Sequence, residues 1–113
     1  DGFVEKLFTS SANSEDVNAI KDMILQNDSN SVIGALTALA ERIDSTEFLQ
    51  NINVPTCIIV GEEDKLTPLT CSENIYRNVI DSELHIIQNA SHLCNIEKSD
   101  EFNRILLNFL KKI

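Results

Sequence analysis

Basic residues are scarce in this chain, and their scarcity argues against one large class of partners. Nine Lys and Arg residues stand against eighteen Asp and Glu residues, so the formal net charge at pH 7 is -9. A field of this sign repels the phosphate backbone of nucleic acids and the surface of anionic lipid. We therefore expect neither nucleic acid nor a membrane among the partners.

Long apolar runs are also absent. The longest ones are far too short to cross a bilayer. The chain is 42% hydrophobic and 24% charged, the usual balance of an ordinary globular protein, and its 113 residues suffice for one small domain at most.

Cysteine is too sparse for a disulfide framework. The three residues Cys57, Cys71 and Cys94 are an odd number and form no C-x-x-C pair, which favours a reducing compartment, and we expect the cytoplasm. Their spacings, taken with His92, fit no zinc pattern, and Cys94 lies outside any nucleophile turn. We therefore expect three buried small residues, with no metal site and no cofactor.

The start of the chain lacks an initiator Met, a basic segment and an apolar segment of the signal-peptide type. No internal repeat, low-complexity tract or Pro/Gly-rich linker is found either. From this beginning we expect further protein sequence before Asp1.

Two amphipathic helices are predicted in the first half. The first covers residues 13–26 with Asn13 or Ser14 as its N-cap, and the second follows the cap signals at residues 27–29. Their apolar faces could line a core, a partner or a membrane, although acidic polar faces argue against a membrane. The residues at helical spacing are Val17, Ile20, Met23 and Ile24, then Val32, Ile33, Leu36, Leu39, Ala40 and Ile43.

The second half follows a β-α-β-α pattern. Residues 57–60 and 83–87 read as strands, and helices follow them, with Thr67 and Ser99 as the expected N-caps. The first strand is continuously apolar, as expected for a parallel strand that is buried on both faces. Two parallel strands are too few for a stable sheet, so we predict an incomplete parallel sheet within a larger α/β fold.

Chemistry is expected in the loops after these strands. Asp64 follows the first strand and His92 follows the second. Reactive residues of open α/β sheets gather at the carboxyl ends of the strands, so the two side chains should meet there. A carboxylate beside an imidazole fixes its tautomer and stabilises the imidazolium, which lets the histidine act as a general base.

Non-catalytic roles are the alternative for Asp64 and His92. Asp64 could be a solvated turn or capping carboxylate, and His92 could be a loop histidine with an ordinary partner. The spacing of Asp64 after a buried strand, together with His92 one strand later, favours the catalytic reading. We expect Glu62 and Glu63 to face solvent, and His85, inside a strand, to be structural.

Four stretches resemble the α/β-hydrolase fold family, near the 3-oxoadipate enol-lactonase-like carboxylesterases and lactonases. Residues 52–68 resemble the acid strand and turn of that family, and residues 90–93 its histidine loop. The last helix and the passage from the helical cap to the core have counterparts in residues 96–103 and 35–46. The resemblance implies that residues 1–50 are the C-terminal part of a cap and its return to the core. Residues 51–113 would then be the last two strands and helices of the core.

The same resemblance implies the roles of a catalytic triad. Asp64 would be the acid and His92 the base, with no cofactor. The G-x-S-x-G turn that carries the nucleophile is absent, because the three glycines do not have its spacing. We therefore expect the nucleophile outside this chain. The family usually has Gly before the histidine; here Ser91 stands there, and it would be strained if that position required a positive φ.

The resemblance implies a parent protein that cleaves carboxylic esters or lactones of small molecules, of which this chain alone would be an inactive C-terminal part. One alternative is a parent haloalkane dehalogenase or epoxide hydrolase with an Asp nucleophile. Another is a non-catalytic binding or assembly module on the same fold. Exposed apolar edges and helix faces would then favour self-association of the chain, or pairing with a missing N-terminal half.

Overall fold

Two parallel strands form the centre of the molecule. The computed structural model describes residues 2–113. Strand β1 (Thr56–Gly61) pairs with β2 (Ser82–Ile87) in a register that runs from Thr56 opposite Ser82 to Gly61 opposite Ile87. Both strands, and their parallel arrangement, were predicted from the sequence and are confirmed.

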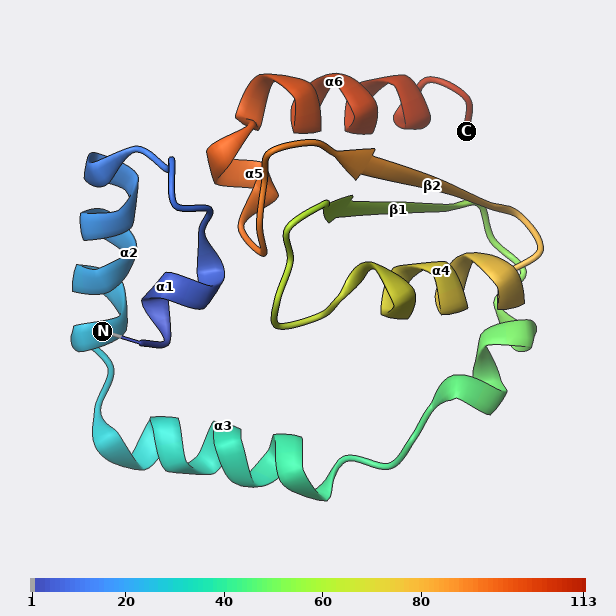
Figure 1. Cartoon of the computed structure of the whole chain (residues 1–113). Helices are drawn as coiled ribbons and strands as arrows, with labels where there is room; N and C mark the ends of the chain where they lie inside the picture. Colours follow the sequence, from blue (N-terminus) through green and yellow to red (C-terminus); the bar gives the residue numbers. More distant parts are fainter. Residues whose placement is uncertain (1) are drawn as a thin grey trace.

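Helices cover both faces of this sheet. Helix α4 (Leu69–Asn78) lies on one side of the strands and α6 (Ser99–Leu110) on the other (Figure 1). The buried residues of the α6 side are Ile87, Ala90, Cys94 and Ile105, against which Cys57, Ile59 and Phe102 pack. Because side chains alternate along a strand, the buried Ile58 and Val60 point to the α4 side.

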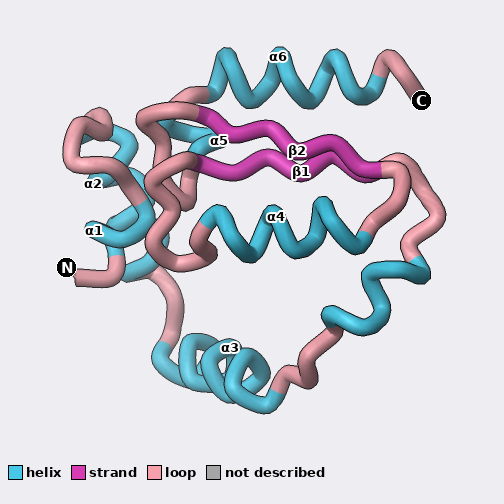
Figure 2. Tube along the Cα trace, turned by 45° about the vertical axis from the view of Figure 1, so that its right-hand side comes forward, coloured by secondary structure: helices cyan, strands magenta, loops and turns pink. Residues whose placement is uncertain are grey.

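The first half of the chain is helical, and its two long helices were predicted, whereas the short helices at its start and end were not. Helix α1 (Val4–Leu7) precedes α2 (Ser14–Leu25) and α3 (Ser29–Glu41), and the 3-10 helix η1 (Thr46–Asn51) leads to β1. The Asn13 side chain caps α2 by accepting from the Glu15 N–H, and Asp28 caps α3 by accepting from two N–H groups. Helices α1 and α2 lie beyond the carboxyl ends of the strands, and α3 lies apart from the sheet (Figure 2).

The apolar face of α3 does not enter a core formed by the described residues. Its large apolar side chains are exposed, Leu36 at 60%. Self-association through such a face stays a prediction. None of the helices within residues 2–113 is both long and apolar enough to cross a membrane. The exposed residues on and after α3 are Val32, Ile33, Leu36, Leu39 and Ile43.

The expected N-caps of the last two long helices are wrong by one position. Helix α4 begins after Pro68, because the Thr67 hydroxyl donates to Asp64 instead of capping the helix. Helix α6 begins at Ser99 itself, with Lys98 as a cap that makes no side-chain bond. A short helix, α5 (Cys94–Glu97), begins inside the segment that the sequence predicts as a loop.

Candidate active site

Backbone hydrogen bonds join the loops that follow the two strands. The N–H of Glu62 donates to the carbonyl of Ile87, and the N–H of Glu63 donates to that of Ala90, each at 2.9 Å. Gly61, at the end of β1, has no room for a side chain, because a Cβ there would collide with the carbonyl oxygens of Ala90 and Ser91. A glycine at this position therefore lets the two loops approach.

Asp64 and His92 meet at this edge of the sheet, as the sequence predicts. Nδ1 of His92 lies 2.9 Å from Oδ2 of Asp64. The Asp64 side chain is 5% exposed and that of His92 is 34% exposed. An ionised carboxylate accepts a hydrogen bond, so Nδ1 carries the proton and Nε2 keeps its lone pair. Since Nε2 has no hydrogen-bond partner within residues 2–113, it is available to take a proton.

The Asp64 carboxylate is held by its own turn as well. Oδ1 accepts from the N–H groups of Leu66 and Thr67, both at 2.9 Å, and Oδ2 accepts from the Thr67 hydroxyl at 2.8 Å. Burial would by itself raise the pKa of Asp64. The N–H of Thr67, the His92 ring, the Thr67 hydroxyl and the N–H of Leu66 together hold that pKa below its usual value. The group therefore stays ionised beside the imidazole at neutral pH.

The Thr67 hydroxyl should contribute to stability only where Asp64 is ionised. A group with a depressed folded pKa contributes stability above its unfolded pKa, about 3.9 for Asp, and loses it as the pH falls through the folded pKa. We expect Thr67→Val to reduce the free energy of unfolding by about 1–2 kcal/mol at pH 7, and by much less once Asp64 is protonated. Urea unfolding across the acid range measures this.

Thr70→Val is the matched control, because the Thr70 hydroxyl makes no hydrogen bond within the described part of the chain. It should change stability little and equally at every pH. A Thr67→Val loss that stays constant down to the lowest pH would contradict a bond to the ionised carboxylate.

The loop before His92 is not strained at Ser91. The non-glycine residue with a positive φ in residues 2–113 is Asn89, at 53°. The concern that Ser91 replaces a glycine that must have positive φ is therefore unfounded in this chain. The Ser91 side chain is buried, and its hydroxyl donates to the carbonyl of Glu63 at 3.2 Å and lies 3.4 Å from that of Lys6. The serine thus adds a third link between the two loops.

Glu97 is a residue of this site that the sequence analysis missed. Its Oε2 accepts from the N–H of Ser91 at 2.6 Å, next to His92. Its Oε1 accepts from the N–H of Thr9 at 2.8 Å and from the Thr9 hydroxyl at 2.6 Å. One carboxylate therefore joins the histidine loop to the segment after α1. No local pattern signals this, because Thr9 and Glu97 are distant in the sequence.

The glutamates next to Asp64 and the three cysteines differ in their exposure to solvent. Glu62 and Glu63 are exposed, as expected. The three cysteines are free; Cys94 is buried, Cys57 is partly buried and Cys71 is exposed on α4, so the expectation of three buried cysteines is wrong for Cys71.

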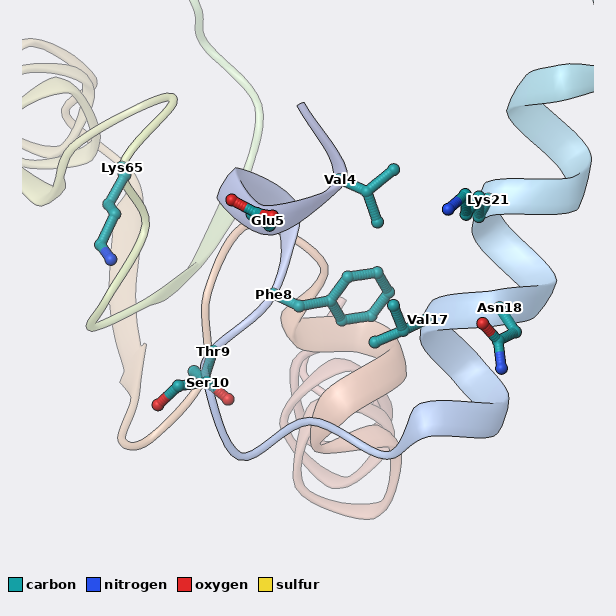
Figure 3. Close-up of a pocket in the computed structure, with 9 residues that line it drawn as sticks. All are labelled: Val4, Glu5, Phe8, Thr9, Ser10, Val17, Asn18, Lys21 and Lys65. Carbon is teal, nitrogen blue, oxygen red and sulfur yellow. The ribbon is translucent and has the colours of Figure 1, made fainter. Parts of the chain in front are cut away.

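A cavity of about 420 Å³ lies beside the acid loop. The apolar side chains of Val4, Phe8 and Val17 come together on one side of it, and Lys65, the neighbour of Asp64, comes from the other (Figure 3). Because the Leu93 N–H donates to the carbonyl of Leu7 at 3.0 Å, the segment that bears Phe8 is attached to the histidine loop. The apolar wall is thus close to the Asp64–His92 pair in the fold.

Comparison with known proteins identifies the fold family. A hydrolase of Pseudomonas sp, named 2-hydroxy-6-oxononadienedioate/2-hydroxy-6-oxononatrienedioate hydrolase, is 31% identical over 80 residues, which are 71% of this chain and 28% of that protein. A thermophilic esterase structure from Thermogutta terrifontis superimposes with a TM-score of 0.93 at 28% identity, over 98% of this chain and 42% of the esterase. This chain belongs to the α/β-hydrolase fold family. No model of a protein family matches it.

The names of relatives on this fold indicate that they cleave different bonds. The proline iminopeptidase of Thermoplasma volcanium is 42% identical over 69 residues, which are 61% of this chain and 23% of that protein. The chain therefore spans less than a third of the length of the curated relatives it matches. The part that it matches is the C-terminal portion of an α/β-hydrolase.

Proposed function

We propose that this chain supplies the acid and the base of a serine hydrolase that cleaves carboxylic esters or lactones of small molecules. The observation that carries the proposal is the bond between Asp64 Oδ2 and His92 Nδ1, which leaves Nε2 free. In the proposed reaction Nε2 takes the proton of a serine hydroxyl as that oxygen attacks the substrate carbonyl. It later returns the proton to the leaving alcohol, and Asp64 stabilises the imidazolium between the two steps.

The nucleophile is proposed to lie outside these 113 residues. The chain has no G-x-S-x-G turn, and no hydroxyl or thiol of the described residues bonds His92 Nε2. Residues 1–50 would be the end of the helical cap and its return to the core, and residues 51–113 would be the last two strands and helices. The 113-residue chain alone should be inactive.

The cavity beside Asp64 is proposed to bind part of the substrate. Its wall of Val4, Phe8 and Val17 suits an apolar acyl or alcohol group, whereas Met23 and Leu36 are more than half exposed and do not line it. Ester or lactone bonds are favoured by the similarity to the esterase structure. The free cysteines support a cytoplasmic location, which is part of this proposal.

Active-site labelling in the whole protein tests this function. A fluorophosphonate probe should label one serine within a G-x-S-x-G turn, and the protein should hydrolyse p-nitrophenyl esters or simple lactones. The isolated chain serves as the unlabelled control. A protein that carries an unlabelled Asp at that turn and releases halide from haloalkanes would overturn the serine mechanism. A protein without labelling or turnover on any of these substrates would overturn the enzyme proposal in favour of a binding module.

A further inference from the structure

A second group of metal-ligating side chains lies on the sheet face that α6 covers. Glu83 and His85 are two apart on β2, so they project from the same face, and the register places Cys57 of β1 directly beside Glu83. The ligand atoms of Cys57, Glu83 and His85 all lie within 4.8 Å of one another. Because the three residues come from two strands, no local spacing in the sequence signals the set.

Two polar atoms of this group are buried without a hydrogen bond. Oε1 of Glu83 and Nε2 of His85 lie 3.1 Å apart, but neither has a partner in hydrogen-bond geometry within the described residues. The other carboxylate oxygen of Glu83 is taken by Lys112 Nζ at 2.5 Å. Because the two atoms face each other at this distance, a cation placed between them would be ligated by both.

We propose that Cys57 Sγ, Glu83 Oε1 and His85 Nε2 bind a zinc ion, with water in the fourth position. Thiolate, imidazole and carboxylate are the three ligand types of protein zinc sites, and four-coordinate zinc accepts this number with one open position. A cavity of about 530 Å³ lined by Glu83, His85 and residues of α6 adjoins the group and gives room for the water and for entry of the ion. The thiol proton leaves to solvent as the Zn–S bond forms.

The place of this site in the fold separates it from the Asp64–His92 pair. Cys57 and Glu83 are the second residues of their strands, whereas Asp64 and His92 follow the opposite ends. A bound ion would connect the beginning of β1 to that of β2, and Lys112, just after α6, is tied to the same carboxylate. The ion should therefore raise the thermal stability of the chain without taking part in hydrolysis.

Titration of the reduced chain with Zn²⁺ and with Co²⁺ tests the proposal. Calorimetry should show one zinc ion per chain, and the melting temperature should rise with zinc concentration. Cobalt should give a thiolate-to-metal charge-transfer band and the intense visible bands of a tetrahedral site. If the chain binds neither ion, or binds cobalt without the thiolate band, the site is wrong.

Single variants locate the ion. Second-shell partners of metal ligands commonly contribute 10–100-fold to affinity, so loss of a ligand in Cys57→Ser, Glu83→Gln or His85→Asn should weaken binding by about 100-fold or more. Cys71→Ser is the matched control, because its thiol is exposed on α4, and it should bind as the unmodified chain does. Circular dichroism checks that each variant is folded, and the unmodified chain's titration stands whether or not one of them unfolds. Unchanged affinity in folded Cys57→Ser or His85→Asn would overturn the assignment.

Discussion

Replacing His92 by alanine is expected to lower kcat for ester hydrolysis in the whole protein by about 10⁴-fold or more, with a smaller effect on KM. The reason is that Nε2 is the proposed acceptor of the nucleophile's proton, and among the described residues no second basic side chain bonds Asp64. Asp64→Asn should reduce kcat by about 10⁴-fold, because the amide can donate to the ring and favour the wrong tautomer. Steady-state kinetics with a p-nitrophenyl ester measures both.

Glu63→Gln is the control for these two variants. Glu63 is adjacent to Asp64 and is exposed, and its side chain makes no hydrogen bond within residues 2–113, so removal of its charge should leave kcat within about threefold. If His92→Ala or Asp64→Asn retained near-normal turnover, the roles of acid and base would be wrong, although the metal proposal at Cys57 would be unaffected.

Gly61→Ala is expected to destabilise the chain by about 3 kcal/mol or more. Overpacking a core usually costs about 1–3 kcal/mol, and it costs most when the neighbours cannot move. Here the added Cβ would meet backbone carbonyl groups of Ala90 and Ser91, which cannot rotate away as a side chain could. The loops would have to separate and draw His92 away from Asp64. Equilibrium urea unfolding, followed by circular dichroism, measures the loss.

Gly34→Ala tests whether the loss of stability is specific to position 61 or follows from any Gly→Ala substitution. Gly34 lies inside α3, and a Cβ there would have no atom within 4 Å. Alanine is the better helix former, so this variant should gain about 0.5–1 kcal/mol. Equal losses in both variants would show that close approach of the two loops is not what requires glycine at position 61.

The order of the elements could be predicted because local chemistry largely decides it. Apolar residues at three and four apart, with Asn13 or Ser14 as one cap and cap signals at residues 27–29, predicted α2 and α3 to within a residue or two of their bounds. The burial of α3 could not be predicted, since the same spacing suits a core, a partner or solvent. Thr67 illustrates a second limit: threonine is a common N-cap residue, but here Asp64 lies close enough to accept a hydrogen bond from its hydroxyl.

The sequence by itself determined the four long helices, the two strands and the positions of Asp64 and His92 after their strands, because periodicity, caps and strand-end loops act over a few residues. Only the tertiary structure decided which atoms meet. The strand register brought Cys57 beside Glu83, the crossing of two backbones required Gly61, and the Glu97 carboxylate reached Thr9. Such contacts join residues far apart in the chain, and their geometry follows from the packing of the whole fold.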